Sequence, residues 1–186
     1  MLLISALGAC TTPAAGPGGG ESAPSAAGPT WEQVKDAEIP GLCTHPPTRL
    51  VDGQDVSLGP LEGRFRLLTT LADGGPAWTP DLRSRAGEAV TAVVAECDAG
   101  GAPWPHLVLY FDQAGRYRAS TAFEEYDWAA LGLAGPARNG VTRVAAAADG
   151  RLEVDLLAER PGDASCCPSG AASLVASLVD STVVVD

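Results

Sequence analysis

Three carboxylates stand beside two aromatic rings near the middle of the chain. Glu124, Glu125 and Asp127 adjoin Tyr126 and Trp128. A glycoside hydrolase uses paired carboxylates of this kind, because one carboxyl protonates the leaving oxygen while the other attacks the sugar or activates water. The same residues suit the solvated end of a β-strand, which is the interpretation we favour. Hydrolysis of a cell-envelope substrate through Glu124, Glu125 and Asp127 is therefore the alternative hypothesis.

The two histidines are the other candidates for acid–base chemistry. His45 precedes two prolines, and His106 follows Trp104 and Pro105. Neither has a nucleophile close by in sequence, so we expect both to be structural. The chain contains no Gly-x-Ser-x-Gly, no His-Glu-x-x-His and no glycine-rich loop followed by lysine. We therefore assign no catalytic residue, no metal ligand and no cofactor.

Aromatic side chains in acidic loops are the candidate ligand-binding residues. Trp104 lies between Pro103 and Pro105, so its ring is held rigidly and could stack on a ligand, although plugging the end of a small sandwich is the commoner role. A few aromatic anchors usually supply most of the free energy of binding. The partner that we expect is an envelope protein or a glycan. The candidate contacts are Trp78, Trp104, Tyr126 and Trp128.

Cys10 ends the first apolar segment of the chain. Leu7-Gly8-Ala9-Cys10 resembles a bacterial lipobox, in which a peptidase cuts before a cysteine that has been acylated. No Lys or Arg precedes Cys10, whereas a secretory signal begins with a basic region. We infer that this signal is truncated and that Cys10 is the lipidation site. The lipid would hold the protein on the extracytoplasmic face of the cell membrane.

The other four cysteines, Cys43, Cys97, Cys166 and Cys167, favour two disulfides in an exported domain. A bond between the adjacent Cys166 and Cys167 would close a strained ring. We therefore expect Cys43 and Cys97 each to bond one member of that pair, in an order that stays open. Zinc bound by Cys43, His45, Cys166 and Cys167 is the alternative, but zinc sites usually contain two separated short-spaced cysteine pairs.

Two cysteine-containing segments carry a family resemblance. One runs from Cys97 through Trp104-Pro105 to Asp112, and the other is Pro161–Ser169 with its Cys-Cys-Pro-Ser element. Both are similar to segments of the LppP/LprE family of actinobacterial lipoproteins. The resemblance covers roughly residues 90–180. It implies an exported, usually lipid-anchored and disulfide-bonded domain, and it brings no known catalytic residue.

Charge and composition limit the partners and divide the chain. Twelve Lys and Arg against 23 Asp and Glu give a net charge of −11, which repels nucleic acid. Residues 11–30 contain no Ile, Leu, Val or aromatic residue, so we expect a disordered linker there. The expected organisation is a truncated signal and lipobox over residues 1–10, this linker, and a single extracytoplasmic domain over residues 31–186.

Elements that could position these residues follow from periodicity and turn signals. Thr30 and Gln33 form a capping box, which predicts a short helix that ends before Pro40. In the rest of the domain, apolar and polar residues alternate with period two, which predicts β-strands. Asp149-Gly150 predicts a two-residue hairpin turn. Residues 72–87 have the composition of a long irregular loop. The predicted fold is mainly β: an antiparallel sheet or small β-sandwich with one short N-terminal helix. The expected strands are Phe65–Leu71, Ala89–Cys97, Leu107–Phe111, Arg116–Phe123, Val141–Ala147, the segment from Leu152, Ser173–Val179 and Thr182–Val185.

Overall fold

The computed structural model describes residues 27–57, 63–99, 102–164 and 166–186. The predicted lipobox with Cys10, and most of the predicted linker, lie outside these residues. The described part is mainly β, with antiparallel sheets and one short N-terminal helix, so the predicted fold class is confirmed. Among the described helices, none has the length and apolar character that a membrane crossing requires.

The larger of the two main sheets is built around the long strand β5. β5 lies between β7 on one edge and both β3 and β4 on the other, and β8 pairs with the far edge of β7. All of these pairings are antiparallel. The strands are β3 (Arg64–Leu67), β4 (Trp78–Arg83), β5 (Ala89–Ala99), β6 (Ala102–Pro103), β7 (Leu107–Asp112) and β8 (Tyr117–Thr121).

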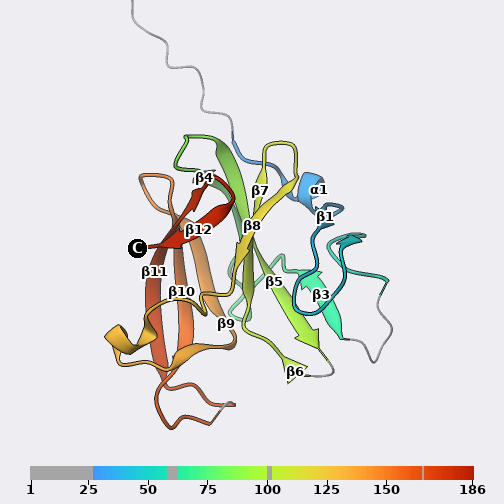
Figure 1. Ribbon diagram of the computed structural model, residues 1–186. Coiled ribbons are helices and arrows are strands. Elements are labelled where there is room, and N and C mark those ends of the chain that lie inside the picture. Colours follow the sequence, from blue (N-terminus) through green and yellow to red (C-terminus); the bar gives the residue numbers. More distant parts are fainter. Residues whose placement is uncertain (1–26, 58–62, 100–101, 165) are drawn as a thin grey trace, which may run out of the picture.

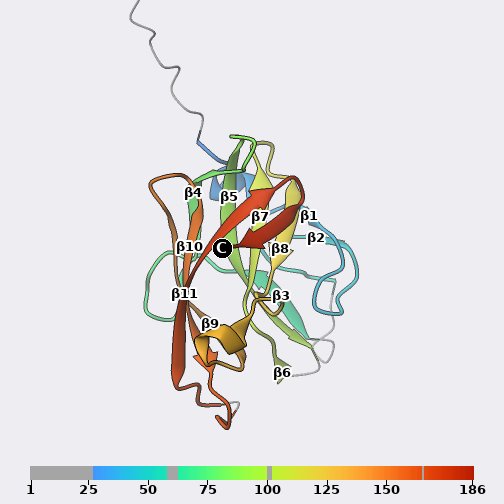
Figure 2. The ribbon, with the colours of Figure 1, turned by 60° about the vertical axis from the view of Figure 1, so that its left-hand side comes forward.

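The second main sheet is a meander of the last four strands, in the order β12-β11-β10-β9. It packs face to face with the β5 sheet, and the two layers are visible in Figure 1 and, after rotation, in Figure 2. Because successive strands pair with each other, short turns are enough to connect them. The strands are β9 (Gly135–Ala146), β10 (Leu152–Glu159), β11 (Gly170–Val179) and β12 (Thr182–Val185).

The β5 sheet is buried on both faces. Ala92 and Val94 belong to the core between the two main sheets, whereas the alternate residues Val93 and Ala95 belong to a second core. This second core is covered by the N-terminal segment, on the side opposite the meander (Figure 1). Burial of both faces explains the nearly unbroken apolar run of β5. The covering elements are α1 (Trp31–Val34), β1 (Glu38–Ile39) and β2 (Thr48–Arg49).

The N-terminal helix is shorter than the sequence predicts. The Gln33 side chain accepts a hydrogen bond from the backbone N–H of Thr30 at 2.9 Å, as in a capping box. However, α1 ends at Val34, and β1 begins four residues later. The helix stops early because the chain must turn to place both Val34 and Ile39 in the second core. Packing therefore overrides the local helical pattern.

Two of the predicted connections are also corrected. Residues 72–87, expected as an irregular loop, contain β4, which pairs with β5 through a register shift between Thr79 and Leu82. This irregularity, next to Pro80, hides the period-two pattern. The β9–β10 hairpin exists, but Ala147 donates to the carbonyl of Arg151. The turn is therefore wider than two residues, and of Asp149 and Gly150 only Gly150 has a positive φ, of 81°.

Candidate functional site

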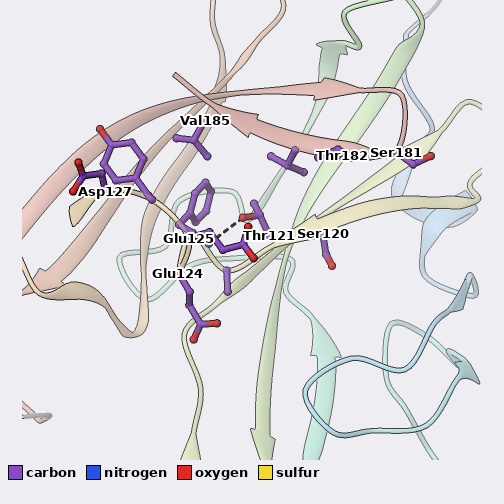
Figure 3. Close-up of a pocket in the computed structure, with 12 residues that line it drawn as sticks. Ser120, Thr121, Glu124, Glu125, Asp127, Ser181, Thr182 and Val185 are labelled. Atoms are coloured by element: carbon purple, nitrogen blue, oxygen red, sulfur yellow. Dashed lines mark hydrogen bonds between the residues drawn. The ribbon is translucent and has the colours of Figure 1, made fainter. Parts of the chain in front are cut away.

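A cleft of about 620 Å³ opens between the edges of the two main sheets. One wall consists of the end of β8 and the loop that follows it, residues 120–127. The facing wall comes from the β11–β12 turn and β12, and contains Ser181, Thr182, Val183 and Val185. We call this site the β8–β12 cleft (Figure 3).

Hydrogen bonds fix the loop that carries the acidic residues. The backbone N–H of Phe123 donates to Oγ1 of Thr121 at 3.0 Å, which turns the chain as β8 ends. The buried Trp128 donates its indole Nε1–H to the carbonyl of Phe123 at 2.8 Å. Asp127 caps the short 3-10 helix η1 (Trp128–Leu131) by accepting from the backbone N–H of Ala130 at 3.3 Å. Residues 122–127 are thus held at both ends.

The three carboxylates gather at one cleft, where two of them point apart. Glu124, Glu125 and Asp127 are all exposed and all line the cleft. Figure 3 shows the carboxylates of Glu124 and Asp127 pointing away from each other, on opposite sides of the loop. A glycoside hydrolase needs two carboxyl groups that flank one bond. Glu124 and Asp127 therefore lack that flanking geometry, and the three carboxylates together supply negative charge along a rim.

Both histidines lie in structural positions. Nε2 of His45 is 3.1 Å from the carbonyl oxygen of Asp98. His106 is buried, its Nδ1 accepts the backbone N–H of Val141 at 3.2 Å, and burial lowers its pKa. Among the described residues that line the cleft there is no histidine. The carboxylates and the histidines therefore do not converge.

The four candidate aromatic residues are separated. Of the four, only Tyr126 lines the cleft, where its half-buried ring meets the ring of Trp128 edge-on at 5.3 Å. Trp128 is itself buried and holds the loop. Trp78 packs against the second core. Trp104 is 37% exposed and precedes β7, outside the cleft.

The structure corrects the expected disulfide pairing. Cys43 and Cys97 are bonded to each other, with their Cα atoms 6.4 Å apart. Cys166 and Cys167 are exposed free thiols. The prediction that each of the first two bonds one of the last two is therefore wrong. Cys43 and Cys97 belong to the second core, whereas the other pair lies in the β10–β11 connection of the opposite sheet.

The zinc alternative finds no geometric support in the described residues, where no group of three or more His, Cys, Asp or Glu side chains could hold a metal ion. Cys166 and Cys167 do contact each other. The hydrogen bond between their thiols raises the pKa of Cys167. The loop that carries them is organised by Asp163, which accepts from the backbone N–H groups of Arg160 at 2.7 Å and Ser169 at 2.8 Å.

The β12 wall of the cleft is the part of the site that sequence reasoning missed. The pattern of residues 182–185 predicts a strand, but no local signal indicates that this strand lies opposite β8.

Comparison of the chain with protein-family models, with curated proteins and with solved structures gave no match.

Proposed function

We propose that this protein is a lipid-anchored binding module on the extracytoplasmic face of the cell membrane and performs no chemistry itself. In this proposal the β8–β12 cleft holds an envelope protein or a glycan. The observation that carries it is the composition of the cleft: apolar surface from Tyr126 and Val183, beside a rim of three carboxylates. A cleft in which apolar side chains adjoin charged and hydroxyl groups offers contacts to either a protein segment or a glycan.

Support for the anchor comes from the sequence. Leu7-Gly8-Ala9-Cys10 resembles a lipobox, and the Cys97–Asp112 and Pro161–Ser169 segments resemble the LppP/LprE lipoproteins. One acyl chain gives only weak membrane binding, so stable anchoring needs the multiple chains of a lipoprotein cysteine or a second contact. A tether between the lipid and the domain would leave the cleft accessible.

Attachment is tested by expressing the protein behind a complete lipoprotein signal peptide in an actinobacterial host. The protein should partition into the detergent phase of Triton X-114, and mass spectrometry should find acyl groups on Cys10. A Cys10→Ala variant should stay in the aqueous phase. Recovery of a soluble protein with unmodified Cys10 from this host would exclude the anchor.

The binding role is tested by photo-crosslinking in cells. A crosslinking amino acid at Thr182, in the cleft wall, should trap one discrete partner. The same amino acid at Ala86, which is exposed on the β4–β5 turn, serves as the matched control and should trap none. Turnover of a glycan or ester substrate that disappears in Glu124→Gln or Glu125→Gln would overturn the proposal in favour of a hydrolase.

A further inference from the structure

Each wall of the β8–β12 cleft includes part of a strand edge: Ser120 and Thr121 of β8 on one side, and β12 on the other. Within the described residues, β8 pairs only with β7, and β12 pairs only with β11. Every second residue of an antiparallel edge strand directs its N–H and C=O groups away from the sheet. Such an edge is a template for a further strand.

The cleft is closed at one end and open at the other. Arg118 of β8 donates to the carbonyl oxygen of Asp180, in the β11–β12 turn, at 3.1 Å. It also approaches a carboxylate oxygen of Glu88 at 3.5 Å. The contact with Asp180 ties the first half of β8 to the opposite sheet, whereas Glu88 precedes β5 in the same sheet as β8. The cleft begins two residues further on, at Ser120, where residues of both walls are accessible.

The charge around this opening selects the occupant. Glu124, Glu125 and Asp127 line the cleft, and its described lining contains no lysine or arginine. The chain as a whole carries a net charge of −11. A cationic ligand would be attracted to this rim. A second copy of the chain would bring the same three carboxylates and would be repelled.

The apolar part of the cleft fits the side chains of an extended segment. Tyr126, Val183 and Val185 lie on the cleft walls and pack against the core between the sheets. In a β-strand, successive side chains point to opposite faces. A peptide that alternates apolar and basic residues could therefore place its apolar side chains against these residues and its basic side chains along the acidic rim.

We propose that the β8–β12 cleft binds an extended cationic segment of an envelope protein, which adds as a strand to the free edge of β8. This inference rests on the proposed binding function and narrows its partner from protein or glycan to a basic peptide. Recognition by strand addition takes affinity from main-chain hydrogen bonds and selectivity from alternate side chains. The acidic rim adds charge complementarity.

The test uses the full chain and fluorescence anisotropy with a labelled peptide of about eight residues that alternates Lys and Val. It should bind saturably. A second peptide has the same sequence, with the backbone nitrogens of alternate residues methylated, which removes N–H donors and keeps the charge. Its affinity should be about tenfold lower or weaker, because main-chain hydrogen bonds are lost. Hydrogen exchange should show protection of the backbone amides of residues 120–122 by the unmethylated peptide.

A charge-matched pair of variants separates the cleft from the general acidity of the protein. The triple variant Glu124→Gln, Glu125→Gln and Asp127→Asn should weaken binding of the unmethylated peptide about tenfold or more. The control variant Glu38→Gln, Asp81→Asn and Glu159→Gln removes the same charge away from the cleft and should have little effect. Circular dichroism of both variants verifies that they are folded.

Three results would overturn the inference. If the methylated and unmethylated peptides bind with equal affinity, the interaction is charge attraction without strand addition. If the cleft variant and the control variant weaken binding equally, the peptide binds outside the cleft. No binding of the Lys-Val peptide, together with cleft-dependent binding of a neutral oligosaccharide, would identify a glycan site. These outcomes leave the proposed binding function standing. That function fails separately, through glutamate-dependent turnover of a substrate.

Discussion

The indole Nε1–H of Trp128 donates a 2.8 Å hydrogen bond to the carbonyl oxygen of Phe123, across the loop that forms one wall of the β8–β12 cleft. Phe123 has a φ of 61°, a conformation that is uncommon for a bulky residue. Burial of both side chains compensates for this conformation. The position of the acidic rim therefore depends on a tryptophan that supports the loop from inside the core.

Replacing Trp128 with Phe should destabilise the protein. The carbonyl of Phe123 loses the shorter of its two hydrogen bonds and keeps the one from the backbone N–H of Tyr126 at 3.2 Å. The lost bond, together with the smaller ring, should cost about 1–3 kcal/mol. Urea denaturation followed by circular dichroism measures the loss. Tyr126→Phe is the control, because Tyr126 is only half-buried and should change the free energy of unfolding little. Equal stability of Trp128→Phe and the wild type would show that this bond does not hold the loop.

Stability should decrease in mild acid because of His106. Burial lowers the pKa of His106 below its ordinary value of 6.5. Above that value His106 is neutral in both the folded and the unfolded chain, so His106 does not lower the free energy of unfolding. Below it the unfolded chain binds a proton that the folded chain resists, so the free energy of unfolding falls until the folded pKa is passed. One proton gives a slope of at most about 1.4 kcal/mol per pH unit.

Urea unfolding at a series of pH values from about 7.5 to 5 measures this dependence. His106→Gln removes the titrating group, while its amide oxygen can still accept from the backbone N–H of Val141. We expect a flatter profile for this variant. An unchanged profile would assign the acid sensitivity to other groups.

Thiol counting should distinguish the two cysteine pairs. In a chain carrying Cys10→Ser, the oxidised native protein should react with a thiol reagent at Cys166 and Cys167 only. Cys43→Ser should lower the free energy of unfolding by about 2–4 kcal/mol, because it opens a covalent loop. The Cys166→Ser and Cys167→Ser variants should leave stability nearly unchanged, since both residues are exposed. Four reactive thiols, or none, would contradict the observed pairing.

Gly28 should tolerate no side chain. Its backbone N–H donates to the carbonyl of Pro80 at 2.9 Å, and an added Cβ would lie 2.6 Å from that oxygen and from Oγ1 of Thr91. Gly28→Ala should therefore cost about 1–3 kcal/mol through overpacking. Gly135→Ala is the control, because its Cβ would meet nothing within 4 Å. Thermal unfolding compares the two variants. Equal melting temperatures would show that the backbone at Gly28 can shift to accommodate a side chain.

The hydroxyl of Tyr110 should contribute nothing favourable to stability. Tyr110 is buried in the core between the sheets, and its hydroxyl has no hydrogen-bond partner among the described residues. Burial raises its pKa strongly. Tyr110→Phe should leave the free energy of unfolding equal or raise it by about 1 kcal/mol, because the desolvation cost disappears. A clear loss of stability in urea denaturation would reveal a partner for this hydroxyl.

The sequence alone was enough to predict the fold class and most of the strands. Alternation in Leu152–Leu156 and the apolar run of Ala89–Cys97 are local patterns, and turn residues separate them. β12 has the predicted bounds, Thr182–Val185. These features can be read from sequence because successive side chains of a strand point to opposite faces, so a strand leaves a local pattern of apolar and polar residues. The cluster of acidic residues from Glu124 to Asp127 could also be recognised from the sequence, because its members are neighbours in the chain.

Tertiary structure alone decided which of these elements meet. Cys43 bonds Cys97, because the N-terminal segment packs on the outer face of the β5 sheet, while Cys166 and Cys167 lie in a connection of the other sheet. The acidic loop became one wall of a cleft only because β12 lies opposite β8. Such proximities join residues far apart in the chain, and they depend on how whole sheets bury their faces, which local periodicity does not specify.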